Sequence, residues 1–480
     1  MTNPSHHRTV FAALCAAALA GCATGPAYEK PALDMPATYS ELPGWTLARP
    51  DPAGPKGDWW VDFHDPLLDR LGPQVAVSNQ NVRAAAANYQ KAAAAIQAAR
   101  AALFPTLGVD ASGSRQRSAA SSPATSKSVE ATVSWSPDLW GQVRDSVRES
   151  QALAQVSEAT LANATLSAQV ALATAVMELR VADENARLLQ RAVDSYRESL
   201  RVVTDQSEAG TTPPSNLYAA RAQLETTQAS LVAVGVARAQ YAHAIAVLVG
   251  QAPEALQIPP ESLMPALPDV PVGLPSTLLQ RRPDIAAAER QMAADNAAIG
   301  VAHAAFFPSV TLSAASGFAS ALSASGLVWS LGASLVGTLF DGGARSAQLD
   351  EARAQYQASV AGYRNTVLTA LQDVENDLSA LRILEQQQLA LDAAVQDATQ
   401  SARIALDEYQ AGTVDYTTLA TAQASQITSQ QSRLNVRLQQ LVNTVALIGD
   451  LGGGFDAARL GADKTPAGAG TNASAPTAGP

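Results

Sequence analysis

Cysteine is almost missing from this chain of 480 residues, which contains only Cys15 and Cys22. Cys15 lies in an N-terminal stretch with the layout of a secretory signal peptide: a short polar region ends at Arg8, and an apolar run follows over residues 10–19. That run is about half of the roughly 20 residues that a helix needs to cross a bilayer. We therefore predict that residues 1–21 are removed on export, which leaves one cysteine and excludes both a disulfide and a thiolate metal site.

The predicted cleavage site is more specific than a generic site of small residues. Leu19-Ala20-Gly21-Cys22 is the pattern recognised in bacterial lipoproteins, in which the cysteine is acylated and becomes the first residue. We predict that Cys22 carries diacylglycerol and palmitate and that the protein needs no other cofactor. The next residue is Ala23 and not Asp, and by resemblance to enterobacterial-type lipoproteins this favours the outer over the inner membrane of a Gram-negative bacterium. The alternative is an ordinary signal peptide followed by a coincidental cysteine, which would leave one free thiol.

Aromatic and basic side chains are also scarce. Aromatic residues make up 5% of the sequence, and 32 basic residues face 43 acidic ones; the loss of Arg8 with the signal peptide takes the net charge from −11 to −12. An acidic balance argues against a nucleic-acid partner. Few bulky side chains give a small core per residue, which favours long helices packed closely on Ala over a thick globular interior.

Catalytic and metal-binding motifs are missing as well. His64, His243 and His303 are far apart, and the sequence has no HExxH, no paired metal-ligand spacing and no nucleophile elbow. The glycines at 452–454 lack the Lys of a phosphate loop and indicate a helix end. We therefore predict no enzyme activity and no metal site.

Three acidic residues lie close together in the second half of the chain. Asp373, Glu375 and Asp377 alternate along the sequence, and only Asp373 and Asp377 share a helix face at the i, i+4 spacing. We expect a solvated or lumen-facing helix surface here, and not a pair of catalytic carboxylates.

The chain is internally duplicated. Residues 81–105 and 284–308 are identical at ten of 25 positions at a spacing of 203, including Ile96 with Ile299 and the Phe-Pro pair at the end of each segment. Three more landmarks recur in the same order: GQVR at 141–144 with GGAR at 342–345, Ala-Gly-Thr at 209–211 and 411–413, and a Gly at 250 and 452.

Each copy contains a strand hairpin after its Phe-Pro pair, where proline ends the preceding helix. Apolar and polar residues alternate with a period of two, which predicts half-buried strands. In the first copy Leu107 and Val109 alternate with polar residues, and Val129, Ala131, Val133 and Trp135 alternate with Ser128, Glu130, Thr132 and Ser134; in the second copy Val310, Leu312 and Ala314 precede Trp329, Leu331, Ala333 and Leu335.

A very long helix follows each hairpin. Residues 142–209 contain neither Pro nor Gly, and residues 344–411 contain only Gly362, so each segment predicts a helix of about 100 Å. Apolar residues spaced 4-3-4-3 predict a coiled-coil seam, at Leu189, Val193, Tyr196, Leu200 and Val203 in the first copy and at Leu391, Val395, Ala398, Ala402 and Ala405 in the second. Each long helix ends at Gly-Thr, and a return helix follows to about residue 248 or 448.

These landmarks divide the sequence into five parts. They are a signal peptide at 1–21, an acylated N-terminal extended segment at 22–75, a first structural repeat at 76–270, a second structural repeat at 271–456 and a disordered tail at 457–480. Four strands cannot close a barrel, and lipid does not tolerate open sheet edges. Association of three copies would supply 12 strands and a hollow wall of 12 helices.

Several segments of the chain resemble the outer-membrane efflux protein family, specifically the lipidated, NodT-like branch of the TolC-type channels that serve RND efflux systems. The resemblance rests on LLQRRPDI at 278–285, FFP at 306–308, WWVDFHDPLL at 59–68, YQAG at 409–412 and DLGGGF at 450–455. It covers residues 22–455. Gly72-Pro73 departs from the family pattern and predicts an interruption before the first helix, and Pro213-Pro214 predicts a stiffer first tip.

The resemblance implies a fold and a set of partners. The fold is a mixed α and β, trimeric TolC-type channel-tunnel, with a 12-stranded outer-membrane β-barrel continued by a periplasmic α-helical barrel. The implied partners are two further copies, a periplasmic adaptor, an inner-membrane RND-type pump and outer-membrane lipid. The expected docking tips contain Gly210, Thr211, Gly412 and Thr413.

A candidate gate residue follows from the same resemblance, because relatives place acidic side chains near the periplasmic entrance. Asp415 is the nearest candidate, and its alternative role is to cap the returning helix. The function implied is a passive exit duct for small toxic compounds. The alternatives are a duct for type I protein secretion and a structural periplasmic coiled-coil lipoprotein.

Overall fold

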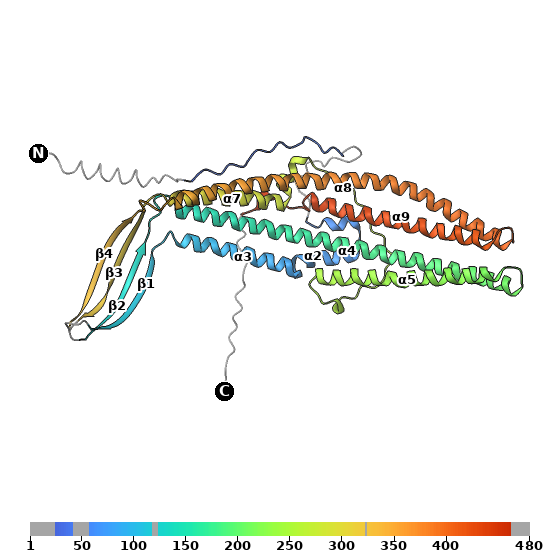
Figure 1. Cartoon of the computed structure of the whole chain (residues 1–480), viewed down its shortest axis with the longest axis horizontal. Helices are drawn as coiled ribbons and strands as arrows, with labels where there is room; N and C mark the ends of the chain where they lie inside the picture. Colours follow the sequence, from blue (N-terminus) through green and yellow to red (C-terminus); the bar gives the residue numbers. More distant parts are fainter. Residues whose placement is uncertain (1–24, 42–56, 118–122, 322–323, 462–480) are drawn as a thin grey trace, which may run out of the picture.

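The chain forms an elongated rod with a sheet at one end and two helical tips at the other (Figure 1). The computed structural model describes residues 25–41, 57–117, 123–321 and 324–461. The predicted signal peptide and Cys22 lie outside the described residues, as does the tail beyond residue 461.

Both repeats have the same order of elements, as the duplication predicts. The first consists of α2 (Pro66–Ser78), α3 (Gln80–Ala101), β1 (Thr106–Gln116), β2 (Ala124–Trp135), α4 (Gln142–Glu208) and α5 (Pro214–Leu248). The second consists of α6 (Leu278–Arg281), α7 (Pro283–Ala304), β3 (Ser309–Ala321), β4 (Ala324–Val336), α8 (Ala344–Gln410) and α9 (Tyr416–Asp450). Short 3-10 helices lie at Trp59–Phe63 (η1), Pro253–Ala255 (η2), Pro275–Thr277 (η3) and Ala457–Arg459 (η4).

Helices α4 and α8 each contain 67 residues and therefore extend for about 100 Å, as predicted. Each begins after a glycine in the left-handed region, Gly141 (φ 87°) or Gly343 (φ 94°). Residues at the same distance from these two glycines are related by a shift of 202 between the repeats.

The helices pack on two large apolar cores among the described residues, the first of which combines α2, α4 and α5 with α9 of the second repeat. Helix α4 lies between α5 and α7 and also contacts α3 and α9, while α8 packs along α9 and α7. The first core includes Phe63, Leu68 and Met177, and the second includes Ile285 and Tyr363, all fully buried. Along the predicted seam of the first repeat, Leu189, Val193, Tyr196 and Val203 are buried.

The four strands form one antiparallel sheet in the order β1-β2-β3-β4. The two hairpins join through β2 and β3, which come from different repeats. Within the described chain, the outer edges of β1 and β4 have no strand partner.

The predicted interruption at Gly72-Pro73 is wrong. Helix α2 continues through Pro73, and the break comes at Asn79, whose backbone is extended and whose side chain caps α3 by accepting from the amides of Asn81 and Val82. Pro73 is tolerated because its ring lies on the exposed face of α2, where water can bind the carbonyl that lacks a helical donor. The aromatic side chain of Trp60 fills the space beside Gly72, so the glycine serves close packing rather than a turn.

The N-terminal segment is extended only in part. Residues 25–41 contain no regular helix or strand and run alongside α7 and α8 (Figure 1), where Asn296 donates to the carbonyl of Pro26 and Glu375 accepts from the amide of Ser40. Residues 59–75, however, form η1 and most of α2. The predicted tail also begins too early, since η4 occupies 457–459 and the amide of Gly461 donates to Glu158.

Candidate functional site

The sheet has one continuous apolar face. Residues directly opposite in an antiparallel sheet share a face, so the register joins Leu107, Val133, Ala314 and Leu331 into one row across all four strands. A second row joins Ala111, Val129, Phe318 and Leu327. These side chains are exposed in the single chain, with Leu331 at 79% and Leu107 at 76%. A register slip of one residue would turn every one of them to the other face.

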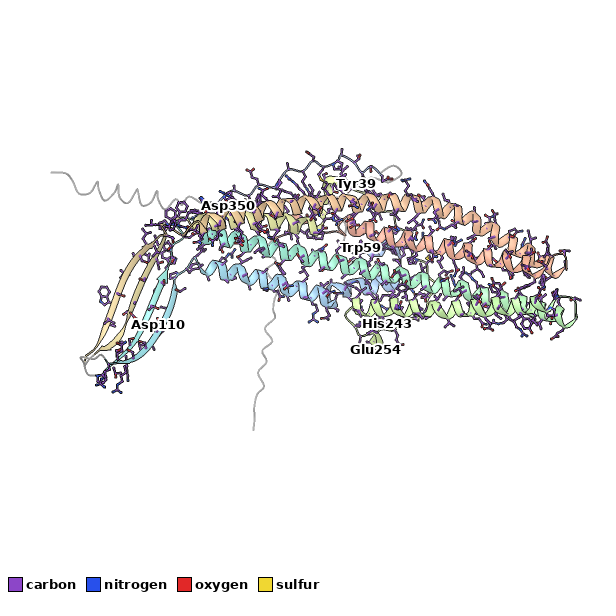
Figure 2. All side chains as sticks on the ribbon, viewed as in Figure 1. Tyr39, Trp59, Asp110, His243, Glu254 and Asp350 are labelled. Atoms are coloured by element: carbon purple, nitrogen blue, oxygen red, sulfur yellow. The ribbon has the colours of Figure 1, made fainter. Side chains whose placement is uncertain are left out.

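The opposite face is polar, as the alternation predicts. Thr132 donates to Asp110 at 3.2 Å, and the hydroxyl pairs Ser112 with Ser128 and Ser114 with Ser126 lie 2.8 Å apart. In Figure 2 the sheet stands clear of the helices, with the labelled Asp110 upon it. Apolar residues on one face and polar residues on the other are the pattern of an outer-membrane barrel wall between lipid and water.

Aromatic side chains gather where the sheet meets the helices. The indole of Trp140 stacks on Phe307 with ring centroids 4.9 Å apart and donates to the carbonyl of Pro308. Trp135 donates to the carbonyl of Leu103, and the guanidinium of Arg345 lies over the ring of Phe306. Trp and Tyr at such a level are typical of the boundary between a membrane and water.

The two helical tips at the far end have the same construction. Gly210 and Gly412 adopt left-handed conformations (φ 69° and 74°), and the amides of Thr211 and Thr413 donate back to the carbonyls of Gln206 and Glu408. This arrangement satisfies the last carbonyls of α4 and α8. All four predicted tip residues therefore lie at the end of the rod opposite the sheet, and Pro214 begins α5 as expected for a proline in a first turn.

Comparison with known proteins identifies the fold. The family Outer membrane efflux protein matches residues 71–251 and 274–453, once over each repeat. The chain belongs to this family. It is 32% identical over 458 residues to the toluene efflux pump outer membrane protein TtgC of Pseudomonas putida, with 92% of this chain and 95% of the relative covered.

Two further relatives agree. Outer membrane protein OprJ of Pseudomonas aeruginosa is 30% identical over 468 residues, with 94% of this chain and 96% of the relative covered. The solved structure of the outer-membrane channel OprN superposes with a TM-score of 0.84 at 29% identity and covers 90% of this chain and 99% of that one. The prediction of a TolC-type channel-tunnel in the outer membrane is confirmed, and this efflux protein is an outer-membrane channel of an efflux system.

Asp415 of the efflux protein caps α9. Its Oδ1 accepts from the amide of Thr418 at 2.9 Å and from the hydroxyl of Thr418 at 2.8 Å. These two bonds hold the pKa of the exposed carboxylate below its usual range. The capping role considered from the sequence is thus present, and the lowered pKa keeps the carboxylate negatively charged at the tip.

The acidic residues on α8 do not form the solvated surface that the sequence suggested. Asp377 is buried, Glu375 accepts from the backbone amides of Ser40 and Glu41, and Asp373 faces Arg282 at 3.7 Å. The prediction considered helix α8 by itself. In the structure the N-terminal segment and the end of α9 lie against this part of α8 and cover it.

No role was predicted for Arg180 or Arg282 of the efflux protein, although Arg282 lies in the LLQRRPDI segment at 278–285. Each is a buried cation that joins elements far apart in the chain, Arg180 to Asp65 and Arg282 to Asp450. A single Arg within the apolar stretch of α4 was the available signal for Arg180. Among the described residues, no group of three or more His, Cys, Asp or Glu is arranged to hold a metal ion.

Proposed function

We propose that three copies of this chain form a continuous duct, with a closed 12-stranded barrel in the outer membrane and a helical barrel in the periplasm. The proposal rests on the four-stranded sheet. One face of the sheet is apolar, as lipid requires, and its two outer edges have no strand partner in the described chain. In hydrocarbon each unpaired backbone group costs several kcal/mol, so only a closed barrel is stable there. Four strands are too few to close one.

The helices support the same assembly. Helices α4 and α5 each contain an 18-residue window apolar enough to cross a membrane, yet only 28% and 11% of these windows are buried. Val232, Val236 and Val247 on α5 are more than half exposed. Because α4 is about three times longer than a bilayer is thick, we assign these apolar surfaces to contacts between copies rather than to lipid.

The duplication defines a test of this assembly at the level of single residues. Val133 of β2 lies opposite Ala314 of β3. A shift of 202 from Val133 gives Leu335 of β4, and a shift of 203 back from Ala314 gives Ala111 of β1. If neighbouring copies join as the two repeats do, Leu335 of one copy lies opposite Ala111 of the next. The variant Leu335→Cys/Ala111→Cys should form a disulfide between copies, because Cα atoms opposite each other in such a pair lie about 4.5–5.5 Å apart.

The matched control is Leu335→Cys/Leu107→Cys, in which the second cysteine is four residues, or about 13 Å, away along the same strand and on the same face. Covalent dimers and trimers should appear on non-reducing gels for the first pair and not for the control. Equal cross-linking of both pairs, or of neither, would count against the proposed closure. The mature chain offers no competing thiol if Cys22 is acylated.

The periplasmic tips are the proposed docking surface for an adaptor. Residues 209–217 and 411–419 lie about 100 Å along α4 and α8 from the sheet, so they reach furthest toward the inner membrane. Gly210 and Gly412 have open space around them, since no atom lies within 4 Å of an added Cβ. We assign docking to a periplasmic adaptor that links the duct to an RND-type pump.

The cargo we propose is small toxic compounds delivered by the pump, with the duct itself performing no reaction. Relatives named for toluene, solvent and antibiotic efflux support this class over a type I protein-secretion duct. A purely structural coiled-coil lipoprotein would not need the amphipathic sheet. Deletion of the gene should raise susceptibility to solvents and antibiotics, and unchanged susceptibility across dyes, antibiotics, aromatic acids and copper would refute the assignment.

The lipid anchor completes the proposal. Gly25, three residues after Cys22, lies close to Asp145 at the start of α4 and to Gly300 near the end of α7, at the end of the rod that carries the sheet. An acyl chain on Cys22 would therefore enter the same membrane as the barrel.

A further inference from the structure

A partly buried group of one cation and four carboxylates joins three helices at the base of the second helical hairpin. Arg282, the N-cap of α7, contacts Asp284 at 2.7 Å, Asp450 at 3.0 Å and Asp373 at 3.7 Å. Asp377 of α8 is the fourth carboxylate. It is 9% exposed, and within the described part of the chain nothing donates a hydrogen bond to its buried Oδ2.

The charges in this group do not balance. Four ionised carboxylates around one guanidinium leave three negative charges, and the cost is greatest for Asp377, because its carboxylate is buried. Asp450 is the last residue of α9, where the helix dipole disfavours another negative charge. One proton bound between Asp377 and Asp450 lowers the net negative charge from three to two and removes a negative charge near the end of α9.

The groups that face Asp377 come from three elements. They are Asp450 from α9, Asp373 from α8 itself and Arg282 from the start of α7. Burial, followed by the negative charge of Asp450, raises the pKa of Asp377 to about 8. Burial also raises the pKa of Asp450, although Arg282 opposes the shift. Tyr39 of the N-terminal segment, labelled in Figure 2, is buried nearby and faces Arg282 and Glu375.

The first repeat shows that the fold does not require these charges. Asn79 occupies the place of Arg282 as the N-cap of α3, and its side-chain amide donates to the last carbonyl of α5, that of Leu248, at 2.8 Å. Arg282 likewise donates to the last carbonyl of α9, that of Asp450, at 3.2 Å. The same joint is thus built twice, once with neutral groups and once with ionisable ones.

The remaining equivalents in the first repeat are neutral as well. The repeat shifts place Asn81 where the second repeat has Asp284, Ala171 where it has Asp373, Ala175 where it has Asp377 and Leu248 where it has Asp450. One hydrogen bond from the N-cap side chain to the last carbonyl of the return helix is sufficient to join the two helices. The four acids of the second joint therefore add a property that the first joint lacks.

We propose that Asp377 and Asp450 share one proton and form a pH-sensitive latch, which holds the end of α9 against α8 and weakens when the proton leaves. The latch lies at the base of the hairpin whose far end is the tip at 411–419. Helix α9 contains 35 residues and extends for about 50 Å, so a small change of angle at the base becomes a large displacement at the tip. The N-terminal segment contacts the same region, because Glu375 binds the amides of Ser40 and Glu41.

The direction of the pH effect follows from linkage. In the open joint Asp377 is in water and titrates near its ordinary pKa of about 4, whereas in the closed joint its pKa is about 8. The closed joint therefore binds the extra proton between these values and is most stable below about pH 4. It loses stability as the pH rises and reaches its lowest level above about pH 8.

Hydrogen exchange on the full-length protein in detergent tests the latch, with protection factors corrected for the intrinsic rate at each pH. Amides in the last two turns of α9 (444–450) should be about tenfold or more better protected at pH 6 than at pH 8. Amides in the last two turns of α5 (242–248), in the neutral joint of the same molecule, should change by less than about twofold. Equal pH dependence at the two joints would overturn the proposal without any mutation.

Substitution gives a second readout. Asp377→Asn keeps the shape of the side chain and cannot ionise, so α9 should stay protected at pH 8 and its pH dependence should disappear. The control is Asp392→Asn on the same helix, where Asp392 is half exposed and contacts Arg433 at 3.6 Å; its pH dependence should remain as in the wild type. A folded Asp377→Asn variant that retains the wild-type pH dependence would refute the latch.

Discussion

Arg180 and Asp65 form a fully buried ion pair between the long helix α4 and the start of α2. Nε lies 2.7 Å from Oδ2, and the two side chains are 1% and 0% exposed. The other oxygen of Asp65 accepts from the amides of Leu67 and Leu68 and so caps α2, while Arg180 also contacts Glu261 at 2.9 Å. One carboxylate therefore holds both a helix end and a buried cation.

Breaking this pair should be costly. Asp65→Ala removes the cap and leaves the buried guanidinium with Glu261 as its one charged partner among the described residues, so we expect the protein to lose roughly 3–5 kcal/mol of stability. Asp65→Asn keeps the cap and should cost less. The control is Arg197→Ala, which removes an exposed pair with Asp194 and should cause a change near zero. Denaturant unfolding of the detergent-solubilised protein measures all three, and equal effects of Asp65→Ala and Arg197→Ala would contradict this account.

The two glycines that end the return helices should resist substitution. Gly250 (φ 74°) and Gly452 (φ 99°) are left-handed, and an added Cβ would lie 2.2 Å from the carbonyl oxygen of Ser78 or 2.0 Å from that of Arg281. Gly250→Ala and Gly452→Ala should therefore lower the melting temperature strongly. Gly210→Ala adds a similar backbone strain (φ 69°) with no atom within 4 Å and should cost only about 1 kcal/mol. A comparable loss in all three would mean that the close approach has no role.

Two variants separate the cap and gate roles of Asp415. Asn caps a helix about as well as Asp, so Asp415→Asn removes the charge and keeps the cap, whereas Asp415→Ala removes both. If three copies of the charge line the entrance, both variants should change cation block in single-channel recordings. If Asp415 only caps α9, Asp415→Ala alone should lower thermal stability, and conductance should stay unchanged in both.

Lipidation is tested by Cys22→Ser. Because Cys22 is the only cysteine after residue 21, the variant should show no labelling with radioactive palmitate. The barrel holds itself in the membrane, so we expect assembly to persist. Labelling of the variant would rule out the predicted acylation site.

Local patterns were sufficient to predict most of the fold. The absence of Pro and the near absence of Gly over 142–209 and 344–411 determined the two long helices, and alternation of polar and apolar residues located the four strands. The duplication then aligned the two halves. The prediction at Pro73 was wrong because the destabilisation of a helix by proline depends on which face of the helix the proline occupies. The sequence pattern did not show that Pro73 lies on the exposed face of α2.

The buried charged joints were beyond the reach of sequence analysis for a different reason. Arg282 and Asp450 are 168 positions apart, and Arg180 and Asp65 are 115 apart. Hydrophobic periodicity describes one helix at a time and contains no information about which polar groups meet across the fold. Asp377 was therefore predicted to lie on a solvated or lumen-facing helix surface, although it is buried.

Native mass spectrometry of the detergent-purified protein tests the central claim most directly. Two unpaired strand edges on a lipid-facing sheet require partners, and three copies supply the 12 strands that close the barrel. The account predicts one dominant species with the mass of three acylated chains. A stable monomer, which would leave the edges of β1 and β4 open in the membrane, would contradict it.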